Sequence, residues 1–335
     1  MSKQQVSFFW FRRDLRLEDN VGLFHALKSK YTVIPLFIFD DAILDSLPYN
    51  DPRVGFIYEN LSKINTQLLK IESALLVKKG KTLAVWELLL TEFDIKEVFF
   101  NKDYEPYAIK RDSAICELLE TNNAIPFSFK DQVIFEEKEI TKADGLPYTV
   151  YTPFKNKWLE KYKSMAPVLE YDATDVFSNF HKCDFVFPSL EQIGFEKSPI
   201  KVKPHNLKFI ANYQDIRDFP ALDQTSYLSP HLRFGTVSIR KLVNWAFHKN
   251  DVFLSELIWR EFFMQILFSF PKVVTQNFKT AYDGIKWRNN EADFQRWCSG
   301  TTGYPMVDAG MRQLNETGYM HNRVRMVAAS FLCKH

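Results

Sequence analysis

The sequence predicts an N-terminal α/β domain with a doubly wound parallel sheet, followed by an all-helical domain. Three observations lead to this fold class. Short runs rich in aromatic and β-branched residues alternate with helix-like segments through about residue 131. Prolines then interrupt the pattern, and after residue 208 strand-like runs disappear. We therefore expect an α/β domain at residues 1–131, a connector at 132–208 and a helical domain at 209–335.

Each element of the first domain has a local signature. Val6–Phe11 is an apolar run that predicts the first strand, and a helix should follow the capping pair Asp19-Asn20. Asp51-Pro52 predicts another helix start, with a cap followed by proline in the first turn. The other expected strands are Thr32–Phe39, Ser73–Val77, Glu97–Asn101 and Ile125–Phe129, and further helices are expected around residues 83–90 and 108–119. This alternation predicts right-handed crossovers between parallel strands.

The turn after the first strand argues against one common use of such a sheet. It reads WFRRDLRLEDN, without the G-x-G-x-x-G sequence that lets a dinucleotide approach the backbone. A classical NAD-dependent dehydrogenase is therefore disfavoured. We interpret Arg12, Arg13, Asp14 and Arg16 as ion-paired residues that shape the turn.

Composition restricts the class of protein. With 46% hydrophobic and 25% charged residues, the chain has the balance of an ordinary globular protein. Its net charge is only +2, so a nucleic-acid site would have to be a local basic patch. The four cysteines form no C-x-x-C motif, which indicates free thiols and no metal site. The N-terminus resembles neither a signal peptide nor a membrane span, so we expect a cytoplasmic protein without membrane contact.

One predicted helix of the second half carries two faces. Within SELIWREFF, residues 255–263, helical spacing places four residues on one side: Glu256, Trp259, Arg260 and Phe263. A separate apolar stripe, spaced by four, consists of Leu254, Ile258, Phe262 and Ile266. The apolar stripe is sufficient to face the core, which leaves the mixed face for another purpose.

Two other stretches concentrate polar groups. TSYLSPHLRFG, residues 225–235, has three hydroxyls within five residues, and Ser229-Pro230 is typical of a helix start. Such an arrangement suits an anion such as a phosphate or diphosphate. TGYPMVDAGMRQLNETGYMHNRVRM, residues 302–326, brings an amide, two guanidinium groups and a thioether together near its end.

Taken together, five stretches resemble the DNA photolyase/cryptochrome family. They are WFRRDLRLEDN, YTVYTPFKNKW, RDFPALDQTSYLSPHLRFGTVS, ELIWREFF and TGYPMVDAGMRQLNETGYMHNRVRMVAASFL, and they extend across nearly the whole chain. The resemblance implies an α/β antenna domain, a connector and a helical FAD-binding domain. MHNRVRM is similar to the members that repair cyclobutane pyrimidine dimers.

The resemblance implies an enzyme, a carbon–carbon lyase that splits pyrimidine dimers in DNA with light. The lesion would be flipped out of the duplex, and reduced FAD would donate an electron to it. The protein would supply orientation and electrostatics for this cofactor chemistry. The implied partner is DNA that contains pyrimidine dimers, and the protein is expected to be a monomer.

The resemblance also implies residue roles. The catalytic residues at the lesion would be Glu256, Trp259, Asn322 and Met326. FAD would be bound by Tyr213, Thr225, Ser226, Tyr227, Leu228 and Ser229. DNA would be contacted by Arg217, Glu256, Trp259, Arg260, Phe263, Asn322, Arg323, Arg325 and Met326, with Lys155 and Lys157 nearby. Trp287 would be the outermost tryptophan of an electron relay, and Arg260 has the alternative role of an internal ion-pair partner.

Two departures from the family pattern leave questions open. Residues 104–108 read YEPYA where folate-binding members have Asn-Glu, so the folate contacts are not carried over and the identity of an antenna chromophore stays open. The chain ends at FLCKH, so we expect the FAD-binding domain to be incomplete at its C-terminus. The alternative function is that of a cryptochrome, a flavin blue-light photosensor without repair activity. The repair-type residues Glu256, Trp259, Asn322 and Met326 favour the enzyme.

Overall fold

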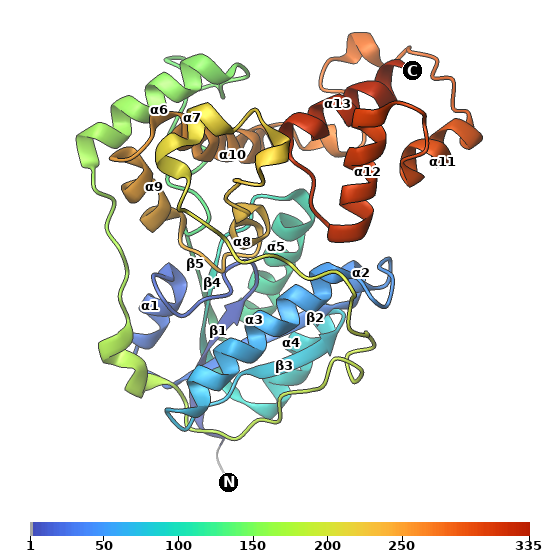
Figure 1. Cartoon of the computed structure of the whole chain (residues 1–335). Coiled ribbons are helices and arrows are strands. Elements are labelled where there is room, and N and C mark those ends of the chain that lie inside the picture. The colour runs from blue at the N-terminus through green and yellow to red at the C-terminus, as the bar shows by residue number, and fades with distance from the viewer. Residues whose placement is uncertain (1–2) are drawn as a thin grey trace.

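A five-stranded parallel sheet forms the N-terminal half of the computed structural model, which describes residues 3–335 (Figure 1). The strands are β1 (Gln5–Phe11), β2 (Val33–Asp40), β3 (Leu76–Gly80), β4 (Asp94–Asn101) and β5 (Ile125–Phe129). Their order is β3-β2-β1-β4-β5, and each neighbouring pair is parallel. The predicted fold class is therefore confirmed: a doubly wound sheet precedes an all-helical region.

Helices cover both faces of the sheet. The helices of this domain are α1 (Val21–Leu27), α2 (Asp41–Leu44), α3 (Pro52–Leu69), α4 (Thr82–Glu92) and α5 (Pro106–Thr121). Alternate residues of β1 point to opposite faces, so Phe9 and Phe11 join the core with α1 and α3. Phe8 and Trp10 join a second core with α4 and α5. Both faces being covered explains why β1 is apolar at nearly every position.

The third strand begins later than the sequence predicted. Strand pairing with β2 starts at Leu76, whereas Ser73–Val77 was expected to be the strand. The backbone N–H of Leu75 donates to the side chain of Asn65 in α3, at 2.9 Å, instead of to a strand. Leu75 is buried in the core with α3, and the edge strand continues through two lysines to Gly80. The apolar Leu75 before β3 is thus buried against α3 and does not belong to the strand. Because β3 is at the edge of the sheet, it can carry charged residues such as its two lysines.

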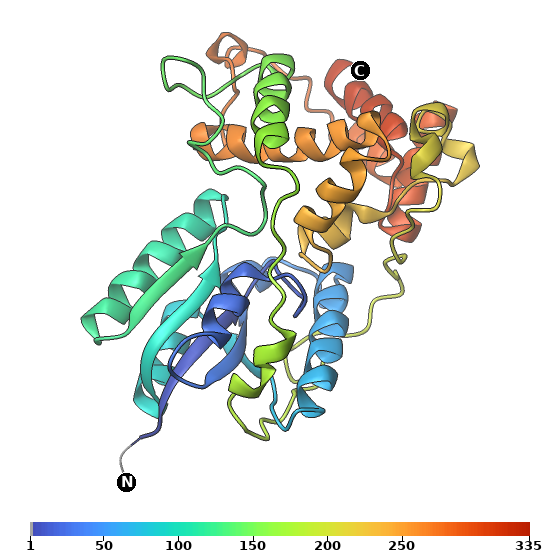
Figure 2. The ribbon, with the colours of Figure 1, turned by 90° about the vertical axis from the view of Figure 1, so that its left-hand side faces the viewer.

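The connector packs against both halves of the molecule. Helix α6 (Tyr151–Met165) inserts Phe154, Trp158 and Tyr162 into the core of the helical region. From residue 166 the chain runs down over the α/β domain and returns along its other side (Figures 1 and 2). There it includes η1 (Thr174–Asn179) and adds Phe180 to the sheet core. The division into residues 1–131, 132–208 and 209–335 stays a prediction, because the connector shares a core with each neighbour.

The rest of the chain is helical. Its elements are η2 (Ile210–Asn212), α7 (Tyr213–Ile216), η3 (Pro220–Leu222), α8 (Leu228–Arg233), α9 (Ile239–Phe247), α10 (Asp251–Ser269), η4 (Pro271–Val274), η5 (Thr280–Tyr282), α11 (Glu291–Ser299), α12 (Pro305–Thr317) and α13 (Asn322–Lys334). Helices α6, α9 and α10 share one core, and α11 to α13 share another. Within residues 3–335, no helix combines the length and the apolar character needed to cross a membrane.

Buried ion pairs join the α/β domain to the helical region. Asp131 accepts from Arg16 and from Arg240 of α9, each at 2.8 Å, and Arg240 also pairs with Asp19 at 3.1 Å. Gly235 lies so close to the turn after β1 that a Cβ there would be 2.1 Å from the carbonyl oxygen of Arg13. These contacts hold the 225–235 stretch against the sheet.

The turn after β1 contains the predicted ion pairs, with one difference. Arg12 pairs with Asp112, Arg13 with Glu105 at 2.6 Å, and Arg16 with Asp131. Asp14 was expected to form an ion pair, but its carboxylate accepts hydrogen bonds from the backbone of Arg12 and the amide of Asn101. Because Asp14 lies in the tight turn itself, the nearest donors are backbone and amide groups.

Candidate functional site

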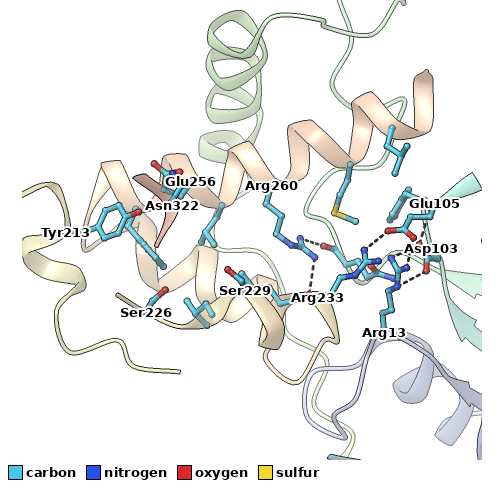
Figure 3. A pocket seen from close by; sticks show the side chains of 18 residues that line it. Arg13, Asp103, Glu105, Tyr213, Ser226, Ser229, Arg233, Glu256, Arg260 and Asn322 are labelled. Atoms are coloured by element: carbon cyan, nitrogen blue, oxygen red, sulfur yellow. Dashed lines mark hydrogen bonds and ion pairs between the residues drawn. The ribbon is translucent and has the colours of Figure 1, made fainter. Parts of the chain in front are cut away.

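A cavity of about 460 Å³ lies between the α/β domain and the helical region (Figure 3). Helix α10 forms one wall, and the 226–233 stretch forms the opposite wall. The lining residues are Arg13, Asp103, Tyr104, Glu105, Gln132, Tyr213, Ser226, Leu228, Ser229, Leu232, Arg233, Phe253, Glu256, Leu257, Arg260, Met264, Leu267 and Asn322. Residues far apart in the sequence therefore converge on one space.

Helix α10 is positioned by its cap and its core stripe. The side chain of Asn250 accepts hydrogen bonds from the backbone N–H groups of Val252 and Phe253 and so caps the N-terminus of the helix. As the spacing predicted, Leu254, Ile258 and Phe262 are buried. Ile266, the last member of that stripe, is only partly buried.

The mixed face of α10 divides into two parts. Glu256 and Arg260 line the cavity together with Phe253, Leu257 and Met264. Trp259 and Phe263 are not among the lining residues, and the side chain of Phe263 is 60% exposed. The face of α10 that lines the cavity is thus rotated about the helix axis relative to the predicted mixed face. It includes Glu256 and Arg260 but not Trp259 and Phe263. Periodicity gives a face about 100° wide but not its centre.

Trp259 is held by an aromatic partner from the connector. The ring of Tyr151 lies parallel to the indole, with ring centroids 3.5 Å apart and planes 9° apart. Phe263 lies 5.3 Å from the indole at 22°. One face of Trp259 is therefore covered by protein.

Glu256 and Arg217 form an ion pair at 2.7 Å at the edge of the cavity. The guanidinium of Arg217 also lies 5.4 Å from the ring centroid of Tyr213 and 3.6 Å from Asp218. Burial, together with the negative charge of Glu256, raises the pKa of Tyr213 to about 12. The sequence placed Glu256 at a lesion and Arg217 at a phosphate, and the structure joins the two side chains.

Arg260 points into the middle of the cavity. It donates hydrogen bonds to the backbone carbonyls of Gln132, at 2.7 Å, and Leu232, at 3.3 Å. Burial lowers the pKa of its guanidinium to about 10, because the charged form loses solvation. Among the described residues no carboxylate forms an ion pair with it, so its positive charge faces the cavity without a direct counter-ion.

The hydroxyl-rich stretch contributes three of its five predicted residues to the cavity: Ser226, Leu228 and Ser229. Thr225 accepts a hydrogen bond from the hydroxyl of Tyr319 at 2.8 Å. Tyr227 has a left-handed backbone, with φ +53°, and its hydroxyl accepts from Lys203 at 2.9 Å. Ser229 was expected to cap the helix, but Tyr227, in a left-handed conformation, is the cap and α8 begins at Leu228, two residues earlier than expected.

Only the first residue of α13 reaches the cavity. Asn322 lines it, and the preceding His321 caps the helix by accepting from the backbone of Arg323. The Arg323 guanidinium pairs with Asp218 at 2.5 Å. Arg325 and Met326 are not lining residues, and Met326 is 55% exposed. Trp287, which is 53% exposed, lies between η5 and α11 and away from the cavity lining.

Sequence reasoning missed Glu261, which follows Arg260. Its buried carboxylate accepts hydrogen bonds from the backbone N–H groups of Ile134 and Phe135, at 2.6 and 3.1 Å, and from the indole of Trp158 at 2.7 Å. Burial raises its pKa to about 7, although these donors act in the opposite direction. The signal was available, because an acid at i+3 from Ile258 falls on the predicted core stripe.

Sequence reasoning also missed a charged cluster at the α/β end of the cavity. Glu105 pairs with Arg13 and with Arg233 of α8, and Arg13 also lies 3.3 Å from Asp103. These groups come from three separate segments, and the sequence gives no spacing that links them. The cavity therefore has charged groups at one end, a guanidinium and hydroxyls in the middle, and Glu256 and Asn322 at the other end (Figure 3).

Such a lining can bind an elongated ligand that carries both an anion and a flat apolar part. The hydroxyls of Ser226 and Ser229 and the charge of Arg260 suit an anionic centre. The side chains of Leu228, Phe253 and Leu257 offer an apolar surface beside it.

Comparisons with known proteins agree on one family. Residues 7–174 match the DNA photolyase family, and residues 253–335 match the FAD binding domain of DNA photolyase. A deoxyribodipyrimidine photo-lyase of Halobacterium salinarum is 35% identical over 98% of this chain and 75% of its own length. One of Synechococcus is 33% identical over 97% of this chain and 73% of its own length. The chain spans about three quarters of these relatives.

Solved structures give the same result. A class III photolyase of Agrobacterium tumefaciens superposes with a TM-score of 0.82 at 31% identity, covering all of this chain and 74% of the other. A photolyase of Sulfolobus tokodaii with two FAD molecules gives 0.79 at 33% identity, over 99% and 75%. A Synechocystis cryptochrome gives 0.78 at 22% identity, over 100% and 76%, which is a similarity of fold.

Proposed function

Because the chain belongs to the DNA photolyase family, we propose that it repairs cyclobutane pyrimidine dimers in DNA with light, using reduced FAD. Relatives named deoxyribodipyrimidine photo-lyase, at 33–35% identity over nearly the whole chain, support this activity. The observation that carries the proposal is the cavity that joins Glu256 and Asn322 to Arg260 and the serine hydroxyls.

The cavity residues fit FAD. Its diphosphate is a doubly charged group, and Arg260 provides a buried cation that has no ion-paired carboxylate among residues 3–335. Ser226 and Ser229 provide hydroxyl donors on the facing wall (Figure 3). We therefore assign Arg260 to the flavin phosphates in place of DNA. Tyr213 and Leu228, which also line the cavity, are kept as FAD contacts, whereas Thr225 and Tyr227, outside the lining, would shape the loop that carries the serines.

When bound, reduced FAD supplies under light the electron that splits the dimer. The role of the protein's own residues is to position the lesion and to stabilise the negative charge that the lesion carries once it has accepted the electron. Glu256 and Asn322, at one end of the cavity, would hydrogen-bond the flipped-out bases. Trp259 and Met326, outside the cavity lining, would contact the dimer from the outer side, where an indole face stacks on bases.

The arginines near the cavity mouth would bind the DNA backbone. Arg217 is about one-fifth exposed, and Arg323 is about half exposed beside Asp218. We propose that these two, with Arg325, contact phosphates around the lesion, while Lys155 and Lys157 extend the patch on α6. Phosphate contacts orient a protein on DNA without selecting its sequence.

One experiment tests the proposal directly. The purified chain is reconstituted with FAD, its flavin absorbance is recorded, and a dimer-containing oligonucleotide is illuminated with blue light. We expect flavin binding and light-dependent loss of dimers, with no loss in a dark control. Stable flavin binding without repair in the unmodified chain would contradict the proposal and favour a photosensor of the cryptochrome type.

A further inference from the structure

Tyr151, within the stretch YTVYTPFKNKW, has no role in the function proposed above, although its ring covers Trp259. Tyr151 is the first residue of α6, and its ring lies flat on the indole at 3.5 Å. Helices α6 and α10 pack against each other in one core. A contact between the connector and the mixed face of α10 therefore determines where the indole lies.

The hydroxyl of Tyr151 is anchored on the same helix that carries Trp259. It lies 2.7 Å from the backbone carbonyl of Ser255, to which it donates, and 2.6 Å from the Ser255 hydroxyl. Ser255 precedes Trp259 by four residues, which is one helical turn. The tyrosine ring is therefore tied to α10 at one end and stacked on the indole along its face. Burial raises the pKa of this hydroxyl to about 12, so it is neutral and able to donate at physiological pH.

This arrangement restricts the rotation of the indole. An unsupported tryptophan on a helix surface samples several rotamers, and binding a flat ligand would then cost the entropy of selecting one. A parallel ring held at 3.5 Å excludes the rotamers in which the indole would swing toward α6. Phe262 adds an edge contact to the indole at 5.6 Å and also packs against Tyr151 at 5.8 Å. The three rings thus support one orientation.

We propose that Tyr151 is a positioning residue for lesion recognition, which holds Trp259 in the orientation that contacts the flipped-out dimer. The inference rests on the proposed function, because it concerns the same lesion pocket. Tyr151 acts through Trp259 and does not touch the DNA itself. It therefore contributes to the preference for damaged over undamaged DNA.

The test compares three variants in the full chain reconstituted with FAD. Tyr151→Leu removes the stacked ring, Tyr151→Phe keeps the ring and removes only the hydroxyl anchor, and Phe154→Leu is the matched control. Phe154 lies on the same helix, is 1% exposed, and packs on Phe262 at 5.2 Å. Dissociation constants for dimer-containing and undamaged oligonucleotides are measured in the dark, with fluorescence anisotropy, together with the denaturation midpoint.

We expect Tyr151→Leu to lower the ratio of lesion affinity to undamaged-DNA affinity by about 3- to 10-fold, the range of an aromatic pair. Tyr151→Phe should restore most of that ratio. Phe154→Leu should lower the denaturation midpoint and leave the ratio unchanged. Near-ultraviolet circular dichroism should show a changed tryptophan band in Tyr151→Leu, as the stacked pair is lost.

The outcomes separate this inference from the proposed function. If the unmodified chain does not prefer dimer-containing DNA, the proposed function fails. If the unmodified chain prefers it and Tyr151→Leu keeps the same ratio, the positioning role alone is overturned. An equal fall of the ratio in Phe154→Leu would also overturn it, because general loosening of the core would then explain the effect.

Discussion

The carboxylate of Glu256 and the guanidinium of Arg217 are 2.7 Å apart and form an ion pair at the edge of the cavity. Glu256 lies on α10, and Arg217 follows the short helix α7, so the pair joins two elements that share the site. Both side chains are partly buried, and each is a candidate for direct contact with damaged DNA. Their roles are consequently coupled, and changing one alters the surroundings of the other.

Arg217→Ala should weaken binding of damaged and undamaged DNA alike, because a phosphate contact is lost. The slope of log affinity against log salt should become flatter by about one unit, which corresponds to one phosphate contact. Filter binding or anisotropy at several salt concentrations measures both effects. If the variant weakened binding of damaged DNA alone, Arg217 would be contacting the lesion and our assignment would be wrong.

Glu256→Gln should leave lesion affinity nearly unchanged and lower repair per absorbed photon. The amide keeps the shape of the side chain but removes the charge and changes its hydrogen bonding to the bases. Repair quantum yield with saturating oligonucleotide is the measurement. In the Arg217→Ala background the same substitution should have a different effect on affinity, by about 0.5 kcal/mol or more, because the two side chains are in contact. If the effects of the two substitutions on DNA affinity simply added, the ion pair would contribute nothing to binding.

Replacing Ser226 and Ser229 together by Ala should weaken flavin retention, because both hydroxyls line the cavity. Each lost hydrogen bond to a charged group is worth about 1.5–3 kcal/mol. Thr225→Ala is the matched control, since that hydroxyl is bonded to Tyr319 and is outside the cavity lining. Flavin occupancy after gel filtration is measured by absorbance. Equal loss in the control would mean that the loop, and not its cavity hydroxyls, holds the cofactor.

Trp259→Ala should lower lesion affinity by about 1–3 kcal/mol, the value of stacking on a base. Ile258→Ala, the neighbouring residue on the buried stripe, should instead lower the free energy of unfolding by about 2–5 kcal/mol. Its ratio of damaged to undamaged DNA affinity should be preserved. Urea denaturation and dimer titration are carried out on both variants. A loss of stability in Trp259→Ala as large as that in Ile258→Ala would identify the indole as a core residue.

Glu261 should make stability depend on pH. Burial raises its pKa to about 7 in the folded chain, against an ordinary value of 4.5. The folded state therefore holds this proton more tightly, so the contribution is fully present below about pH 4.5 and is lost as pH rises through about 7. Each unit of pKa corresponds to about 1.4 kcal/mol.

Urea denaturation between pH 5 and 8 measures this effect. The free energy of unfolding should fall more steeply with pH in the unmodified chain than in Glu261→Gln, which cannot ionise. If the two proteins showed the same pH dependence, the three N–H donors would be holding the carboxylate in its charged form. Those donors come from Ile134, Phe135 and Trp158, so the variant should also loosen the connector.

Sequence periodicity and local caps determined the fold class and much of α10. The apolar run Val6–Phe11 predicted the buried strand β1. The spacing of Leu254, Ile258 and Phe262 identified a buried helix face, because side-chain direction follows directly from helix geometry. Proline and capping residues located the start of α3 at Pro52. The shifted third strand shows the limit of this reasoning, since an apolar run such as 73–77 can be buried on a helix as well as in a sheet.

Tertiary structure alone decided how the candidate site residues are paired. Helical spacing grouped Glu256, Trp259, Arg260 and Phe263 on one face, and the fold then gave the first three different partners. Those partners are Arg217, Tyr151 and the carbonyls of Gln132 and Leu232, which lie 28 to 128 residues away in the sequence. Local periodicity specifies the direction of a side chain. Its partner depends on how distant segments pack, because a hydrogen bond or a stacked ring requires positions accurate to a fraction of an ångström.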